Sequence, residues 1–183
     1  MPESKADKLA RFISDYGIPE YDANILCEDI ELADYFESVV KTSNNPKLSS
    51  NWIMTEVMRN LKEKNIMFTI SAEHLGEIIT LIEKNVISTK IAKELFEIKL
   101  TDDRAPEVIV KEKGMVQVAD TGAIEAMIDE VINANPKMVE DYKNSDEGRK
   151  PRVLKGLIGQ VMKLSKGKAN PNMVTELMTK KLG

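Results

Sequence analysis

The amino-acid sequence predicts an all-α protein made of two small helical domains, and three observations support this prediction. Hydrophobic residues make up 42% of the chain and aromatic residues only 5%, a composition that suits helices packed by Leu, Ile, Val and Met. Apolar residues recur three and four positions apart along most of the chain, which is the spacing of one helix face. Around residues 101–118 this spacing is lost, and the pattern divides in two.

The first hundred residues predict about five helices, each with one apolar face. The first covers about residues 4–16 and is stopped by Gly17 and Pro19. The second is acidic on its other face, which would repel nucleic acid. The apolar stripes of these two helices are formed by Leu9, Phe12 and Ile13, and by Leu26, Ile30, Ala33, Phe36 and Val40.

Turn-forming residues separate the remaining helices of this region. The turn at 43–46 precedes the third helix, Ser71 begins the fourth, and Asn85 with Ser88 marks a break before the fifth. Their stripes consist of Trp52, Ile53, Val57 and Leu61, then Leu75, Ile78, Ile79 and Ile82, then Ile91, Ala92, Leu95 and Phe96.

A domain boundary is predicted where the helical period disappears. The polar segment 101–106 interrupts the pattern, and 114–118 has no helical period at all. We therefore expect a helical domain at 1–113, a hinge at 114–119 and a tail domain at 120–183. Because few apolar residues anchor the boundary, we expect a flexible joint near Gly114.

The tail domain is predicted to be a small helical bundle. Its first helix has a continuous apolar stripe, Asn135 with Pro136 caps a short helix through Tyr142, and two further helices close the chain. The stripe is formed by Ile124, Met127, Ile128, Val131 and Ile132.

Charge is distributed unevenly between the two ends of the chain. Residues 1–144 carry 17 Lys/Arg against 27 Asp/Glu, net −10, whereas residues 145–183 carry 9 against 3, net +6. A local field attracts partners even when the whole molecule, at net −4, is acidic. The basic end is therefore the candidate for binding an anionic partner.

One helix of the tail separates its apolar and basic residues onto two faces. From Arg152 to Lys166 the helical period places the apolar residues on one half and the basic residues with two glycines on the other. The apolar half contains Val153, Leu154, Leu157, Ile158, Val161 and Met162. The basic half contains Arg152, Lys155, Gly156, Gly159, Lys163 and Lys166.

Gly156 and Gly159 need a physical reason, because each glycine inside a helix costs about 1 kcal/mol relative to alanine. Close approach of another group is the usual reason. That group is either a phosphate backbone neutralised by the lysines or a neighbouring helix, and the residues alone leave both explanations open. An ATP-binding P-loop is excluded, because Gly159 lies eight positions before Gly167 and Ala169 follows Lys168.

The end of the chain predicts a second anion-attracting feature. Gly167 is expected to end the basic helix, where nearby lysines complement the negative end of the helix dipole. Asn170 is expected to cap the last helix, with Pro171 at its first position. We expect a helix start beside Lys166 and Lys168 to attract an anion.

We predict neither a catalytic nor a metal site. His74 is the single histidine and falls at a helix start, and Cys27 is the single cysteine and falls in an apolar stripe, where a buried thiol is usual. The acidic pairs at 28–29 and 102–103 point apart or are solvated. No run of about 20 apolar residues exists, and no signal peptide opens the chain, so we expect a cytoplasmic protein without membrane contact.

The tail also resembles a known family. Residues 156–163 (GLIGQVMK) and 165–171 (SKGKANP) resemble the terminal signature of the B subunit of the aspartyl/glutamyl-tRNA amidotransferase, often called GatB. Residues 135–142 (NPKMVEDY), 21–23 (YDA) and 33–37 (ADYFE) look like the same family. The resemblance covers nearly the whole chain.

The resemblance implies a function in translation. The family is a trimeric, glutamine-dependent ligase that uses ATP to amidate misacylated Glu-tRNA(Gln) or Asp-tRNA(Asn). In it, the B subunit activates the carboxylate in a large amino-terminal domain, where ATP and Mg are used, and a helical domain and a tail similar to the freestanding YqeY proteins hold the tRNA. This chain would then be a carboxy-terminal fragment without catalytic centre or cofactor, and its partners would be tRNA(Gln) or tRNA(Asn) and the A and C subunits.

The residues expected to contact RNA follow from the face and from the resemblance together. They are Lys155, Gly156, Gly159, Lys163, Lys166, Lys168 and Asn170, with Arg149, Lys150 and Arg152 added from segment 145–152, which is longer than the basic link usual in the family. The alternative is a scaffold module that contacts the other subunits without binding RNA.

Overall fold

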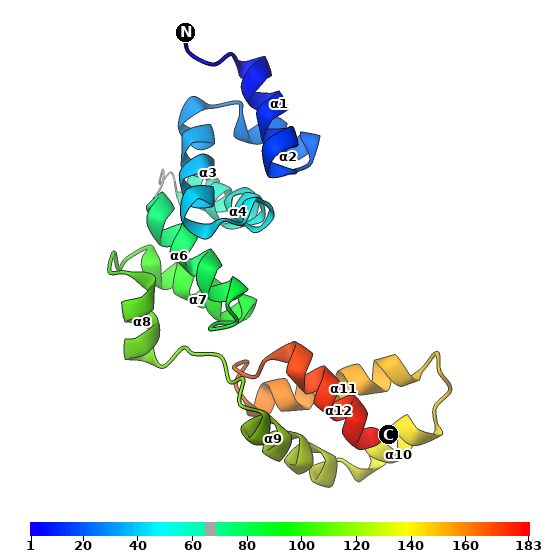
Figure 1. Ribbon diagram of the computed structural model, residues 1–183. Helices are drawn as coiled ribbons and strands as arrows, with labels where there is room; N and C mark the ends of the chain where they lie inside the picture. The colour runs from blue at the N-terminus through cyan, green and yellow to red at the C-terminus, as the bar shows by residue number, and fades with distance from the viewer. Residues whose placement is uncertain (65–68) are drawn as a thin grey trace. The chain divides into compact units, whose positions relative to one another are not determined.

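The protein is described from a computed structural model, which describes residues 1–64 and 69–183. The regular secondary structure of these residues is helical, apart from one isolated parallel bridge between Val118 and Ala169 (Figure 1). The all-α prediction is therefore confirmed. Within the described part of the chain, no helix is both long enough and apolar enough to cross a bilayer.

The chain forms two compact units. Unit 1 consists of Met1–Lys84 and Glu94–Val110, and unit 2 consists of Asn85–Lys93 and Lys111–Gly183. The helices before residue 120 are α1 (Lys5–Tyr16), α2 (Glu20–Leu26), α3 (Ile30–Ser43), α4 (Pro46–Trp52), the π-helical turn η1 (Ile53–Val57), α5 (Met58–Lys64), α6 (Ala72–Glu83), α7 (Thr89–Lys99) and α8 (Pro106–Lys113).

Unit 1 is built around α3. The rings of Phe12 and Tyr16 from α1 meet Phe36 of α3 at centroid distances of 5.2 and 5.3 Å, and all three pairs are tilted or edge-on. Further along, α3 packs against α6, and the Tyr35 hydroxyl donates to the Ile70 carbonyl at 2.7 Å. Helices α1 and α6 begin where the sequence predicts a helix start. The hydroxyls of Ser4 and Ser71 accept hydrogen bonds from backbone N–H groups in the first turns of these helices.

One predicted helix of unit 1 is wrong in extent. The apolar spacing from Leu26 to Val40 predicts a single acidic helix, but the structure has two, α2 and α3, with a break between them. Asp29 is extended, at φ −123° and ψ 130°, and its carboxylate accepts from the Glu31 N–H at 2.9 Å. Asp29 is therefore an N-cap rather than a member of an acidic helix face. Ile30, predicted as part of the apolar stripe, is 72% exposed, so its place in that stripe is also wrong.

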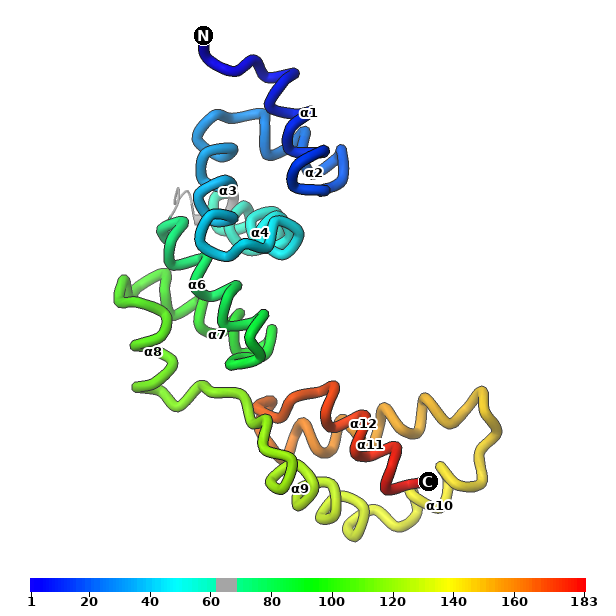
Figure 2. The backbone as a smooth tube through the Cα atoms, viewed as in Figure 1, coloured from blue at the N-terminus to red at the C-terminus, as the bar shows by residue number. Residues whose placement is uncertain are grey.

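Unit 2 contains the tail bundle, whose helices are α9 (Thr121–Ala134), α10 (Pro136–Asn144), α11 (Lys150–Leu164) and α12 (Pro171–Leu182). Helices α9, α11 and α12 pack against one another, and α10 packs on α11 (Figure 2). The predicted stripe of α9 faces this core, with Ile124, Ile128 and Val131 buried. Their partners in the core are Tyr142, Leu157, Val161, Ala169, Val174, Met178 and Leu182.

The segment between α8 and α9 is not helical, as its sequence predicts, and it is fastened to unit 2. Val118 N–H donates to the Lys168 carbonyl at 2.6 Å, and Asn170 N–H donates to the Val118 carbonyl at 2.9 Å. Gln117 N–H donates to the Val86 carbonyl at 2.7 Å, which ties residues 85–93 to the same unit. Whether 114–119 acts as a hinge between the two predicted domains stays a prediction.

Candidate nucleic-acid interface

Helix α11 ends two residues earlier than its sequence suggests. Its last helical residue is Leu164, and Lys166 and Gly167 follow with left-handed φ angles of 55° and 77°. Gly167 N–H donates to the Met162 carbonyl at 2.8 Å, which closes the helix end. Gly167 is therefore part of the terminating turn, as expected for glycine after a helix, but Lys166 already lies in the turn rather than in the helix.

The two faces of α11 are arranged as predicted. Leu157 and Val161 are fully buried, and Val153, Leu154, Ile158 and Met162 pack against the same core. The basic half is exposed at every predicted position of the helix and its terminating turn, namely Arg152, Lys155, Gly156, Gly159, Lys163 and Lys166. The amphipathic period alone is sufficient to place these residues, because α11 is packed on one side only.

The surroundings of the two glycines separate the two explanations for them. A Cβ added to Gly159 would meet no heavy atom within 4 Å among the described residues. A Cβ added to Gly156 would meet the Met138 Cε of α10 at 3.0 Å. Packing against a neighbouring helix therefore accounts in part for Gly156, but it does not account for Gly159, whose bare backbone faces open space.

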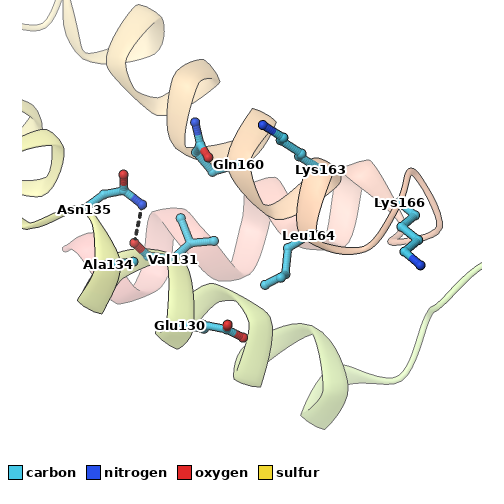
Figure 3. A pocket seen from close by; sticks show the side chains of 8 residues that line it. All are labelled: Glu130, Val131, Ala134, Asn135, Gln160, Lys163, Leu164 and Lys166. Carbon is cyan, nitrogen blue, oxygen red and sulfur yellow. Dashed lines mark hydrogen bonds between the residues drawn. The ribbon is translucent and has the colours of Figure 1, made fainter.

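The lysines beside these glycines keep their charges unpaired. In the part of the chain that the structure describes, Arg152, Lys155, Lys163 and Lys166 form no ion pair with a carboxylate. Lys163 and Lys166 also line an open groove of about 410 Å³ between α9 and α11 (Figure 3). We call Arg152, Lys155, Gly156, Gly159, Lys163 and Lys166 the basic face.

Four other predicted contact residues are engaged within the tail. Lys168 Nζ donates to the Gly114 carbonyl at 3.1 Å. Arg149 pairs with Asp141 at 3.1 Å, while Lys150 lies 3.9 Å from Glu147 and 5.5 Å from the centre of the Tyr142 ring. Asn170 is buried and caps α12. Each of these four residues therefore has a local partner within the tail.

The Asn170 cap yields a stability prediction. Its Oδ1 accepts from Asn172 N–H at 3.0 Å and from Met173 N–H at 3.2 Å, and both donors lose their partner in Asn170→Ala. We expect this change to lower the free energy of unfolding by about 1 kcal/mol in a urea titration. Asn170→Ser, which keeps a capping oxygen, should recover most of the loss. Equal stability of the alanine and serine variants would show that the cap contributes nothing.

Asn135 also differs from its prediction. Pro136 does begin α10, but the Asn135 side chain makes no cap hydrogen bond. Its Nδ2 instead donates back to the Val131 carbonyl at 2.8 Å. The proline alone therefore sets the start of this helix.

Lys90 lies beside the turn at the end of α11, and no sequence pattern indicates this. Its Nζ is 2.9 Å from the place a Gly167 Cβ would take, and Lys90 lines a hollow with Met162, Lys163 and Lys166. Lys90 belongs to α7, far from these residues in the chain. Only the folded arrangement of unit 2 brings it to them.

The structure shows the local surroundings of Asp102, His74 and Cys27. Asp102 pairs with Arg104 at 2.7 Å, and this hydrogen bonding lowers the pKa of Asp102 to about 2, so it holds no proton near neutral pH. His74 donates its backbone N–H to the Ser71 cap, and burial raises the pKa of the Cys27 thiol. Among the described residues, no three His, Cys, Asp or Glu side chains are grouped to hold a metal ion.

Comparison with known proteins gives one consistent result. A family model described as "GatB domain" matches residues 34–182. A protein of Fusobacterium nucleatum, named as the B subunit of an aspartyl/glutamyl-tRNA(Asn/Gln) amidotransferase, is 64% identical over the whole chain. Proteins of the same name from Prosthecochloris aestuarii and Chlorobaculum tepidum are 48% and 49% identical over 100% and 97% of the chain. The chain spans 38%, 38% and 37% of the length of these three relatives.

Proposed function

The chain belongs to the GatB family, and from this premise we propose that it is a tRNA-binding region of the B subunit of an aspartyl/glutamyl-tRNA(Asn/Gln) amidotransferase. The proposed complex amidates misacylated Asp-tRNA(Asn) or Glu-tRNA(Gln) with glutamine and ATP, together with the A and C subunits. Within it, this region binds the tRNA and carries no reaction centre of its own.

The observation that carries this proposal is the exposed basic face of α11. Its lysines have no carboxylate partner in the described part of the chain, and Gly159 leaves bare backbone between them. Lysines that neutralise RNA phosphates release condensed counterions, which favours binding at low salt. An open glycine lets the sugar-phosphate backbone come closer to the helix than any other residue would allow.

Salt dependence of tRNA binding tests this proposal. Titrating labelled tRNA at several salt concentrations should give a logarithm of the association constant that falls linearly with the logarithm of salt concentration. The slope should amount to roughly 0.9 for each phosphate neutralised, or roughly 0.7 on single strands. Binding that is undetectable at low salt, or whose affinity does not change with salt, would overturn the proposal.

Gly159→Ala separates the stability of α11 from its function. Because the added Cβ meets no neighbour, the helix should gain the usual preference for alanine, about 1 kcal/mol in the free energy of unfolding. If RNA approaches at Gly159, the same variant should bind tRNA roughly tenfold more weakly, a cost of about 1.4 kcal/mol. Urea unfolding and tRNA titration measure the two effects.

Gly122→Ala serves as the control for that variant, since it lies in the first turn of α9 and its Cβ would meet only the Asp120 Oδ2 at 3.6 Å. It should leave the tRNA affinity unchanged. A Gly159→Ala protein that is more stable and binds tRNA as well as the wild type would remove Gly159 from the proposed interface.

We propose that the ATP chemistry belongs to a part of the GatB protein outside this chain. Two observations support this proposal: the chain spans 38% of the length of the Fusobacterium nucleatum relative, and among the described residues no three His, Cys, Asp or Glu side chains are grouped to hold a metal ion.

A scaffold role is the second candidate, and it is favoured by a separate observation. Tyr21 of α2 and Ile30 of α3 are each 72% exposed, which is high for large apolar side chains. Such residues suit contacts with the A and C subunits. Size-exclusion chromatography with those subunits, beside the tRNA titration, distinguishes the candidates: the scaffold role alone predicts co-elution with the other subunits and no tRNA binding.

A further inference from the structure

We propose that the groove between α9 and α11 binds one unpaired nucleotide of the RNA, with its base against Leu164 and its phosphate at Lys163 and Lys166. This inference rests on the proposed function and adds to it the form of RNA that the tail selects. The groove is lined by Glu130, Val131, Ala134, Asn135, Gln160, Lys163, Leu164 and Lys166 (Figure 3).

Leu164 is the first observation that points to a base. It is 43% exposed, and among the described residues of α9 to α12 it is the only large apolar side chain that is exposed rather than buried or half-buried. Figure 3 shows it pointing from α11 toward α9, into the groove. An aliphatic side chain contributes nothing to phosphate binding, whereas the flat apolar face of a base packs against such a side chain.

The polar groups of the groove suit the edge of a base. The Gln160 amide is exposed and forms no hydrogen bond within the described part of the chain. Asn135 uses its Nδ2 for the Val131 carbonyl, which leaves its Oδ1 as an acceptor. One free amide and one acceptor beside an apolar wall are the groups with which proteins read unstacked bases.

Charge fixes the direction in which the nucleotide lies. Lys163 and Lys166 stand on the α11 side, and Glu130 stands on the α9 side (Figure 3). A phosphate near Glu130 would be repelled, so the phosphate lies at the lysines and the base extends toward α9. There the Glu130 carboxylate is an acceptor for a base amino group. The volume of about 410 Å³ lies within the roughly 300–1,000 Å³ of sites for small ligands.

A paired RNA helix fits these features less well than an unpaired nucleotide. The bases of a duplex are stacked, and a protein contacts its phosphates and 2′-hydroxyls. Those contacts would involve Lys163 and Lys166, but Leu164 and Gln160 would contact nothing on the duplex. An acidic peptide from a partner protein would also use the lysines, but it would not select between RNA forms.

The test compares Leu164→Ala with Lys163→Ala on two probes, intact tRNA and a fully paired RNA duplex. Leu164→Ala should lower the tRNA affinity about fivefold without changing the slope against salt, and should leave duplex affinity unchanged. Gln160→Ala should behave in the same way. Lys163→Ala should weaken binding of both probes and reduce the slope by roughly 0.9 on the duplex.

Val108→Ala is the matched control, since Val108 is a helical apolar residue of α8 with a similar exposure of 48%. It should change neither affinity nor slope. Unfolding midpoints of all variants check that each protein is folded; if Leu164→Ala proves unstable, Leu164→Met keeps an apolar surface and should bind tRNA like the wild type.

The outcomes separate this inference from the proposed function. If Lys163→Ala reduces the slope while Leu164→Ala and Gln160→Ala bind tRNA normally, the nucleotide site is wrong and the tRNA-binding proposal stands. The nucleotide site would also be wrong if Leu164→Ala weakened binding to tRNA and to the duplex equally. It would be wrong as well if Leu164→Ala impaired assembly with the other subunits and left RNA binding unchanged. If the wild-type chain binds neither probe, both proposals fail together.

Discussion

Replacing Lys155, Lys163 and Lys166 together by glutamate is expected to lower the affinity for tRNA on the order of 100-fold or more at moderate salt. Each change removes one positive charge of the basic face and adds a negative charge in its place. These three lysines form no ion pair in the described part of the chain, so their full charge is available to a polyanion. Fluorescence titration of labelled tRNA at several salt concentrations measures both the affinity and the change in slope.

Two single variants serve as controls for this experiment. Lys180→Glu makes the same change of charge at the far end of α12 and should have a small effect. Lys168→Glu should weaken binding less than Lys163→Glu, because the Lys168 ammonium group is held by the Gly114 carbonyl. If the triple variant binds tRNA like the wild type, or if Lys180→Glu weakens binding as strongly as the triple variant, the basic face is not the site of binding.

The features that could be predicted from sequence are those that a single helix determines. The spacing of Leu157 and Val161 is enough to orient α11, and the orientation of α11 is enough to expose Lys163 and Gly159. The same holds for the start of α12 at Asn170, because a cap and its donors lie within four residues. Local periodicity and local hydrogen bonding therefore account for the all-α fold and for the basic face.

Features that depend on two distant segments could not be predicted. The hydrogen bond from Lys168 to Gly114 and the place of Lys90 beside Gly167 both join segments far apart in the chain. The apolar surroundings of Leu164 depend on α9 as well as α11. A helical pattern gives the direction of each side chain from its own axis, but not the element that it meets.

The break between α2 and α3 shows a different limit. Asp29 is one of several acidic residues near the start of α3, and its neighbour Glu28 has the same charge. Only the extended backbone of Asp29 distinguishes a cap from a solvated helix position. Because the apolar spacing in the sequence continues across the break, periodicity alone predicts one helix, although Ile30 is exposed in the structure.

Close packing of helices explains another glycine, Gly76 of α6. A Cβ at Gly76 would lie 2.5 Å from the Thr42 Cβ, 2.8 Å from its Cγ2 and 3.1 Å from the Val39 carbonyl oxygen. The Thr42 Cβ is fixed to its backbone, so α3 and α6 would have to move apart along the contact that organises unit 1. No rotation of the threonine side chain relieves the shortest of these contacts.

Gly76→Ala is therefore expected to lower the free energy of unfolding by up to about 2 kcal/mol. Overpacking typically costs about 1–3 kcal/mol, the 2.5 Å contact with the Thr42 Cβ places this site at the upper end, and the better helix propensity of alanine offsets about 1. Urea unfolding monitored by far-ultraviolet circular dichroism measures this change. The same substitution at Gly159 should act in the opposite direction, because its Cβ enters open space. Adding Thr42→Ala to Gly76→Ala should recover only part of the loss, since it removes the 2.8 Å contact and keeps the Cβ contact at 2.5 Å. A Gly76→Ala protein as stable as the wild type would mean that α3 and α6 separate at little cost, and the close approach of these helices would then not be what stabilises unit 1.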